Sequence, residues 1–181
     1  IVCNDTILCS LKREADILSK LDHENIVHYI DSRHYAIRIE YAGTCIVDML
    51  SWTGPLGDSL ARDEIAIQIM RGVAYVHSQG VWHLDVKLDN MAIDVNGKIK
   101  IFDFGLAHDT TMQTKSDLGP RGSFLYAAPE VLSQDHYDGS LVDTWSVGIC
   151  IFAMTYGFFP FKYAHINDPV FANAAMCQSI P

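Results

Sequence analysis

Apolar residues recur at helical spacing in two stretches of the chain, and a third stretch is mostly apolar. The pattern predicts helices over Ser10–Leu21, Asp63–Ser78 and Asp143–Tyr156. Gly80 follows the second stretch and is typical of a helix stop. The apolar stripe of that second helix consists of Ile65, Ile69, Val73 and Val76.

Two short strands are expected between the first two helices. Residues Ile26–Ile30 and Tyr35–Tyr41 alternate loosely and are rich in β-branched and aromatic side chains, which predicts strands joined by a turn at Asp31–His34. Gly43 and the glycines of Gly54–Gly57 mark loops, with room for a short helix between them.

A second hairpin is predicted in the middle of the chain. Residues Met91–Val95 and Ile99–Phe102 flank an Asn-Gly pair at 96–97, which is the strongest short-range hairpin signal. Residues Asp109–Arg121 are polar and predict a long surface loop. Helices and strands do not alternate as in a doubly wound sheet, so the expected fold class is α+β with a mainly helical second half.

Composition restricts the class of protein further. A chain of 181 residues fits one domain, and 49% apolar with 19% charged residues is ordinary for a globular protein. The net charge of -9 argues against nucleic acid or an anionic membrane as the main partner. The longest uncharged run, Trp145–Phe161, contains two glycines and a proline and is read as a buried helix.

Cysteine usage indicates the redox environment. The five cysteines are odd in number and lack CxxC spacing, so neither a zinc site nor a disulfide framework is expected. A reducing, intracellular location, either cytoplasmic or nuclear, is therefore the expectation. The chain starts at Ile1 rather than Met and ends in a polar stretch read as helix-poor, so we expect a fragment of a longer protein.

The densest chemistry lies between His83 and Gly105. Asp85, Lys87 and Asn90 fall within six positions, and Asp103 follows the second strand of the predicted hairpin. Such a set suits phosphoryl transfer. A carboxylate can accept a hydroxyl proton, a lysine can neutralise a phosphoryl group, and amide and carboxylate oxygens can hold a divalent cation.

These residues, in this order, resemble the protein kinase family of the eukaryotic type. Lys87 two positions after Asp85 and the Gly122-Ser123 pair are similar to the serine/threonine class, and the closest branch is the calcium/calmodulin-dependent or checkpoint-like one. The resemblance rests on five ordered segments: Lys12-Arg13-Glu14 with Ile26-Val27, His83–Asn90, Asp103-Phe104-Gly105, Ala128-Pro129-Glu130, and Asp143 to Gly148.

The resemblance implies a two-lobed kinase fold. Residues 1–42 would be the remnant of the N-terminal lobe, consisting of the regulatory helix, two strands and the hinge. Residues 43–181 would be a truncated, mainly helical C-terminal lobe.

The resemblance also assigns roles at the reacting centre. Asp85 would be the catalytic base, and Lys87 would contact the γ-phosphate of ATP. Asn90 and Asp103 would hold Mg²⁺. The implied activity is phosphorylation of serine or threonine hydroxyls in protein substrates, with a regulatory protein as a further partner.

Other residues would form the nucleotide site by the same resemblance. Glu14 would pair with the ATP-binding lysine, and Ile39 would be the gatekeeper. Glu40 and Ala42 would belong to the hinge that meets adenine, and Ala92 would pack under the adenine ring.

The sequence departs from the family pattern in two ways. Leu84 stands where most members carry the arginine that pairs with a phosphorylated activation loop, so that phosphate switch is not expected here. Neither a Gly-rich loop nor the ATP lysine lies within the 181 residues, and we expect this chain alone to bind ATP poorly.

Two alternatives remain open from the sequence. A pseudokinase that acts by binding a partner would need neither the lysine nor the Gly-rich loop, although it would have no need of the Asp85, Lys87, Asn90 and Asp103 set. A small-molecule phosphotransferase of related fold is the other alternative, and the segment Ala128–Glu130 argues against it.

Overall fold

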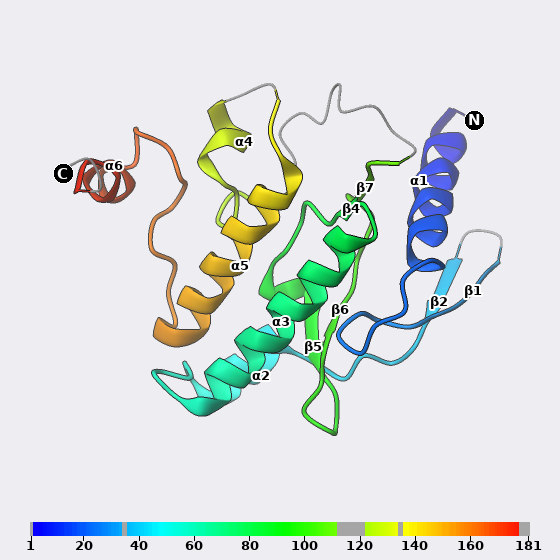
Figure 1. Cartoon of the computed structure of the whole chain (residues 1–181), viewed down its shortest axis with the longest axis horizontal. Helices are drawn as coiled ribbons and strands as arrows, with labels where there is room; N and C mark the ends of the chain where they lie inside the picture. Colours follow the sequence, from blue (N-terminus) through cyan, green and yellow to red (C-terminus); the bar gives the residue numbers. More distant parts are fainter. Residues whose placement is uncertain (1, 34–35, 112–121, 134–135, 178–181) are drawn as a thin grey trace.

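The computed structural model describes residues 2–33, 36–111, 122–133 and 136–177. Figure 1 shows the arrangement of its elements. The helices are α1 (Val2–Leu18), α2 (Ile46–Thr53), α3 (Leu60–Ser78), α4 (Pro129–Ser133), α5 (Gly139–Tyr156) and α6 (Pro169–Cys177), with a 3-10 turn η1 (Leu88–Asn90). The strands are β1 (Tyr29–Arg33), β2 (Ala36–Ile39), β3 (Thr44–Cys45), β4 (Val81–Trp82), β5 (Met91–Ile93), β6 (Ile99–Ile101) and β7 (His108–Asp109).

Helices α3 and α5 pack against each other at the centre of the molecule (Figure 1). Both begin a few residues before the predicted starts, because capping side chains lie upstream of the apolar stripes. Ser59 accepts the backbone N–H of Arg62 at the start of α3, and Asp138 accepts that of Ser140 at the start of α5. Gly157 ends α5 in the left-handed conformation with φ of 76°.

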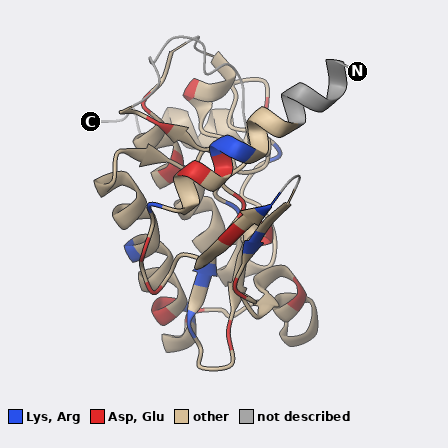
Figure 2. Cartoon of the chain, turned by 90° about the vertical axis from the view of Figure 1, so that its right-hand side faces the viewer, with Lys and Arg blue, Asp and Glu red and all other residues tan. Residues whose placement is uncertain are grey.

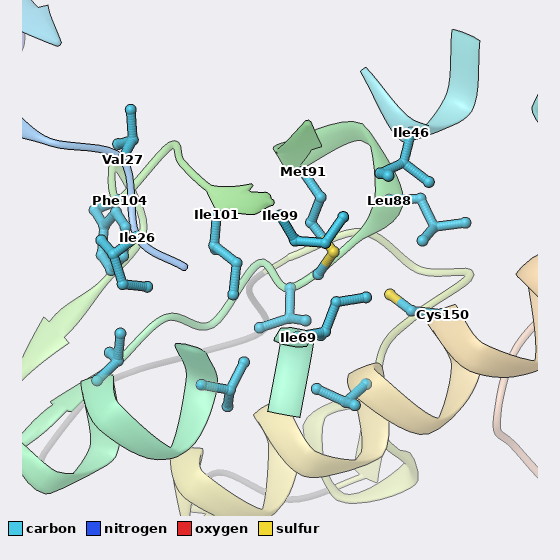
Figure 3. Close-up of a cluster of buried hydrophobic side chains, with 14 of the residues drawn as sticks. Ile26, Val27, Ile46, Ile69, Leu88, Met91, Ile99, Ile101, Phe104 and Cys150 are labelled. Carbon is cyan, nitrogen blue, oxygen red and sulfur yellow. The ribbon is translucent and has the colours of Figure 1, made fainter. Parts of the chain in front are cut away.

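The main hydrophobic core lies between these two helices and the central hairpin. Figure 3 shows Ile69 of α3 and Cys150 of α5 together with Met91, Ile99 and Ile101 from the strands. All five side chains are almost completely buried. The long uncharged run lies in the core helix α5 as far as Tyr156, as expected, and its last five residues leave the helix at Gly157. None of the described helices is long and apolar enough to cross a membrane.

The predicted central hairpin is confirmed. Strands β5 and β6 are antiparallel, with Met91 opposite Ile101, and β3 adds to the other side of β5. Asp94 tightens the turn, because its carboxylate accepts the backbone N–H groups of Asn96 and Lys98 at 2.8 and 2.9 Å. The hairpin brings the residues just before β5 close to those just after β6.

The first pair of strands is shifted from its prediction. The sequence pattern placed a turn at Asp31–His34, but Asp31 lies within β1, opposite Arg38 of β2. Arg38 donates from Nε and Nη2 to the two carboxylate oxygens of Asp31, both at 2.7 Å. This cross-strand ion pair favours the observed register. Figure 2 shows that charged residues of both signs lie on this two-stranded hairpin. Ile26, predicted as strand, forms only an isolated parallel bridge to Ile101.

Two helix predictions need correction at the chain ends. Helix α1 begins at Val2 rather than Ser10, and it ends at Leu18, where successive i→i−3 bonds from Lys20 and Leu21 tighten the chain. The C-terminal stretch, expected to be helix-poor, contains α6. Asp168 precedes that helix, and its Oδ1 accepts the N–H groups of Val170 and Phe171, which caps the first turn.

Candidate active site

The loop between β4 and β5 carries the predicted catalytic residues. Hydrogen bonds to a side chain of α5 hold this loop in place. The buried carboxylate of Asp143 accepts the backbone N–H groups of His83 and Leu84, both at 2.8 Å, and lies 2.8 Å from Nε2 of His77. Leu84 has φ of 62°, which is rare for a residue with a side chain. The bonds from Asp143 stabilise this conformation, and the chain then turns to present Asp85.

Asp85 is surrounded by hydrogen-bond donors. Its Oδ2 accepts from Nζ of Lys87 at 2.7 Å and from Nδ2 of Asn90 at 3.2 Å. Its Oδ1 accepts from the hydroxyl of Ser123 at 3.1 Å. Only 9% of the Asp85 side chain is exposed, so these contacts fix the direction of its carboxylate.

Ser123 reaches this group from a segment 38 residues away along the chain. Its hydroxyl also accepts a 3.1 Å hydrogen bond from Lys87. Gly122 permits the approach, because a Cβ at that position would lie 2.7 Å from the carbonyl oxygen of Leu84. Asp85, Lys87 and Ser123 thus form one connected group of polar side chains.

Asn90 and Asp103 lie at the same end of the β5–β6 hairpin. Asn90 immediately precedes β5, and the N–H of Phe102 donates to the carbonyl oxygen of Asn90 at 3.0 Å. The side-chain amide nitrogen of Asn90 is committed to Asp85, which leaves its amide oxygen as the atom available to a cation. Asp103 follows with φ of 63°, a second non-glycine residue in the left-handed region. Amide and carboxylate oxygens are the hard ligands that Mg²⁺ prefers, so this donor set fits a divalent ion.

Glu14 of α1 lies against the segment that carries Asp103. The backbone N–H of Phe104 donates to its carboxylate, and burial together with the nearby charge of Asp103 raises the pKa of Glu14. The neighbouring Arg13 donates to the carbonyl oxygen of Gly105 at 3.4 Å. Helix α1 and residues Asp103–Gly105 are therefore in direct contact.

The residues expected near adenine lie along two adjoining segments. Ile39 is the last residue of β2, and the partly buried Ala42 packs against the main core. The strand that follows pairs with β5, so that Cys45 lies opposite Ala92, which is 3% exposed.

The carboxylate of Glu40 already has two partners. The carboxylate pairs with Lys100 at 2.7 Å and accepts the N–H of His28 at 2.8 Å. Burial opposes ionisation of this carboxyl, but the bonds from Lys100 and His28 outweigh it and lower the pKa of Glu40. The backbone N–H of Glu40 donates to the carbonyl oxygen of His28 at 2.9 Å, so the backbone carbonyl of Glu40 is the group that remains for the hinge role that the sequence suggested.

Leu84 is buried in a small apolar cluster beside the main core. Only 4% of Leu84 is exposed, and its neighbours in the cluster are Trp82, Ala128, Val131 and Val142. This cluster joins the catalytic loop to α4 and α5 through apolar contacts. A charged group at position 84 would have no place among these side chains.

Comparison with known proteins identifies the family. Residues 4–180 match the family model described as protein kinase domain, which is nearly the whole chain. This chain belongs to the protein kinase domain family. Within the described residues, this kinase domain has short strands and six α-helices, which agrees with the expected α+β class and a truncated two-lobed kinase fold.

Individual relatives of this kinase domain are moderately similar. The chain is 35% identical to CBL-interacting protein kinase 3 of Oryza sativa subsp. japonica, over 86% of this chain and 36% of that protein. It is 37% identical to serine/threonine-protein kinase ppk8 of Schizosaccharomyces pombe, over 87% and 32%. It is 38% identical to serine/threonine-protein kinase chk1 of the same yeast, over 80% and 30%. The kinase domain therefore spans about a third of the length of these curated relatives.

Sequence reasoning missed the direct contact of Ser123 with Asp85. The sequence pattern identifies Ser123 only as part of the Gly122-Ser123 pair that resembles the serine/threonine class. The Gly-Ser pair was the available signal, since glycine before a small hydroxyl residue suits a close approach to another segment. Asp143 belongs to a segment that carries the family resemblance, and its carboxylate holds the backbone of His83 and Leu84.

Proposed function

We propose that this kinase domain transfers the γ-phosphate of ATP to serine or threonine hydroxyls of protein substrates. The observation that carries the proposal is the arrangement of Lys87, Asn90 and Ser123 around the carboxylate of Asp85. A base that must point at one substrate proton needs its carboxylate fixed, and these donors supply that.

In the proposed reaction, the substrate hydroxyl donates its hydrogen to an oxygen of Asp85. The hydroxyl oxygen forms a bond to the γ-phosphorus, and the bond from that phosphorus to the bridging oxygen of ADP breaks. The hydroxyl proton passes to Asp85 and then to solvent. Lys87 contributes positive charge next to the transferring phosphoryl group, where charge develops.

Asn90 and Asp103 are the proposed ligands of Mg²⁺. When bound, the ion neutralises phosphate charge and orients the polyphosphate. Glu14, Ile39, Glu40, Ala42 and Ala92 are proposed to line the nucleotide site. The carboxylate of Glu14 would serve by pairing with a lysine, and Glu40 would serve through its backbone.

The serine/threonine class is supported by the similarity to relatives that bear this name and by the position of Lys87 two residues after Asp85. An intracellular location and a regulatory protein partner are proposed from the same similarity. The intact group around Asp85 favours an enzyme over a pseudokinase, because partner binding alone does not require it.

The test is phosphate transfer from γ-labelled ATP to three peptides that differ only in the acceptor residue: serine, threonine or tyrosine. It uses the protein that contains this chain. The proposal predicts transfer to serine and threonine peptides, little transfer to the tyrosine peptide, and loss of transfer when Mg²⁺ is chelated. Transfer to none of the three would contradict the proposal and favour the partner-binding alternative.

A further inference from the structure

An ion pair joins the end of α1 to strand β7. Nζ of Lys20, two residues after α1 ends, lies 2.9 Å from Oδ2 of Asp109, although the two residues are 89 positions apart in the chain. The Asp109 side chain is 7% exposed, whereas that of Lys20 is 44% exposed. Solvent and salt screen a pair with one buried partner less than they screen a pair on the open surface.

The carboxylate of Asp109 is held from two directions. Its Oδ1 accepts the backbone N–H of Thr111 at 2.9 Å and the Thr111 hydroxyl at 2.6 Å. These bonds are local, whereas the bond from Lys20 comes from a different element of the fold. Removal of the Lys20 ammonium would therefore break the link to α1 and leave the local bonds of Asp109 in place.

Strand β7 is also joined to the strand that leads into the catalytic loop. It pairs with β4, with Asp109 opposite Val81 and His108 opposite Trp82. The rings of Trp82 and His108 stack with their centroids 5.3 Å apart. Because β4 ends at Trp82, just before the loop that carries Asp85, Asp109 lies where α1, β7 and the approach to that loop meet.

The segment from Asp103 to Asp109 contacts α1 and its C-terminal extension near both of its own ends. Near the first end, the N–H of Phe104 donates to the carboxylate of Glu14, and at the second end Asp109 pairs with Lys20. Between these contacts, Phe104 and Ala107 are completely buried in the main core. Asp103 itself has the uncommon left-handed backbone, which persists only where the surrounding structure holds it.

We propose that Lys20 and Asp109 are positioning residues for the phosphoryl transfer. By tying α1 to β7, the pair holds Asp103 where its carboxylate and the amide oxygen of Asn90 can bind the same Mg²⁺ ion. The inference rests on the proposed kinase function and adds two residues to it. Neither Lys20 nor Asp109 is assigned a contact with the substrate or with the reacting atoms.

The first test is the Mg²⁺ dependence of phosphate transfer to a serine peptide. Lys20→Met should raise the free Mg²⁺ concentration that gives half-maximal transfer by about 3- to 10-fold. Lys20→Arg keeps the charge and should stay close to the parent, and KM for the peptide should change little in both variants. Lys98→Met is the matched control, because Lys98 is 48% exposed and pairs with Glu24 at 2.7 Å beside the β5–β6 turn.

The direction of this change separates positioning from two simpler effects. Loss of a positive charge would by itself favour the binding of a cation, so a simple charge effect of Lys20→Met would lower the required Mg²⁺ concentration. A general loss of stability would reduce the amount of folded protein and leave the half-maximal Mg²⁺ concentration unchanged.

A double variant tests whether the two residues act as a pair. Lys20→Met combined with Asp109→Asn should raise the half-maximal Mg²⁺ concentration no more than the stronger of the two single changes. Effects that multiply in the double variant would mean that the residues act independently, which would overturn the proposed pair.

Hydrogen exchange tests the positioning without nucleotide, Mg²⁺ or turnover. In the protein that contains this chain, Lys20→Met should make the backbone amides of the fragment covering residues 103–111 exchange about 10-fold faster. Lys98→Met should match the parent. Fragments from α3 should keep their protection in both variants, which excludes general unfolding as the cause.

The outcomes separate this inference from the kinase function. Parent-like Mg²⁺ dependence and exchange in Lys20→Met would overturn the inference and leave the kinase function standing. If the parent transfers no phosphate and Lys20→Met still exchanges faster, the kinase function is overturned and the pair is supported as the link that holds this segment. No transfer and no difference in exchange would overturn both.

Discussion

The backbone N–H of Leu84 donates a 2.8 Å hydrogen bond to Oδ1 of Asp143, a carboxylate that is fully buried on α5. The same carboxylate accepts the N–H of His83. Leu84 has the left-handed backbone that turns the chain toward Asp85, so α5 fixes the direction of the loop that carries Asp85.

Replacing Asp143 with alanine should therefore destabilise the domain strongly. Two buried N–H groups would lose their acceptor, which costs about 2–5 kcal/mol of unfolding free energy in total. Urea unfolding measures the change. Asp16→Ala on the exposed face of α1 is the control and should change stability by less than about 0.5 kcal/mol. Equal stability of the two variants would show that Asp143 does not hold the loop.

Ser123 should position Asp85 and Lys87 without entering the reaction. Ser123→Thr keeps a hydroxyl and should retain most activity, whereas Ser123→Ala removes bonds to both partners and should lower kcat about 10- to 100-fold. Steady-state kinetics with a serine peptide separates kcat from KM, and KM for the peptide should change little. An alanine variant as active as the threonine variant would rule out the positioning role.

Glu14 should reduce stability at neutral pH. Its folded-state pKa is raised by burial and by Asp103, so the ionised carboxyl opposes folding above that pKa and ceases to do so as the pH falls. Glu14→Gln keeps an acceptor for the N–H of Phe104 and should raise the unfolding free energy at pH 7.

The gain from Glu14→Gln should disappear below about pH 4.5, where the carboxyl is protonated in the unfolded chain as well. Unfolding in urea across this pH range checks the prediction, with Glu64→Gln on the exposed face of α3 as control. A variant less stable than the parent at pH 7 would mean that the carboxylate of Glu14 is a stabilising group.

Asp109, unlike Glu14, should stabilise the folded domain at neutral pH through its ionised carboxylate. Burial opposes its ionisation, but hydrogen bonds from Thr111 and Lys20 outweigh it and lower the pKa of Asp109 to about 2. Its contribution to stability is therefore present above its ordinary pKa of 3.8 and is lost as the pH falls toward 2.

Asp109→Asn should be less stable than the parent at pH 6, and the difference should shrink between pH 4 and pH 2. Urea midpoints at pH 6, 4, 3 and 2 measure it, and Asp16→Asn is the matched exposed control. A difference that stays constant with pH would assign the loss to packing rather than to the charge.

The sequence was sufficient for the elements with long, regular patterns. The sequence patterns of α3, α5 and the Asn-Gly hairpin are each typical of one kind of element. Together these elements bring Asp85, Asn90 and Asp103 close to one another. The two-residue strands β3, β4 and β7 are too short to produce a pattern. Their pairing is decided by tertiary packing.

Two further features could not be predicted from local sequence. The register of β1 and β2 depends on the Asp31–Arg38 ion pair, whereas a charged residue between apolar runs ordinarily indicates a turn. The bond from Ser123 to Asp85 joins segments far apart in the chain, so only the folded structure reveals it. Leu84 could be predicted in part. The sequence showed that leucine replaces the usual arginine of the family, but it did not show the apolar cluster in which Leu84 is buried.

The most direct test of the account is phosphate transfer by the protein carrying Asp85→Asn, measured together with nucleotide binding. Asparagine is similar in shape and can still accept a hydrogen bond from Lys87, but it cannot take up the substrate proton. The account predicts a fall in kcat of about 10²- to 10⁴-fold with ATP affinity nearly unchanged. A variant that transfers phosphate at a rate within about threefold of the parent, well outside that range, would contradict the assignment of Asp85 as the base.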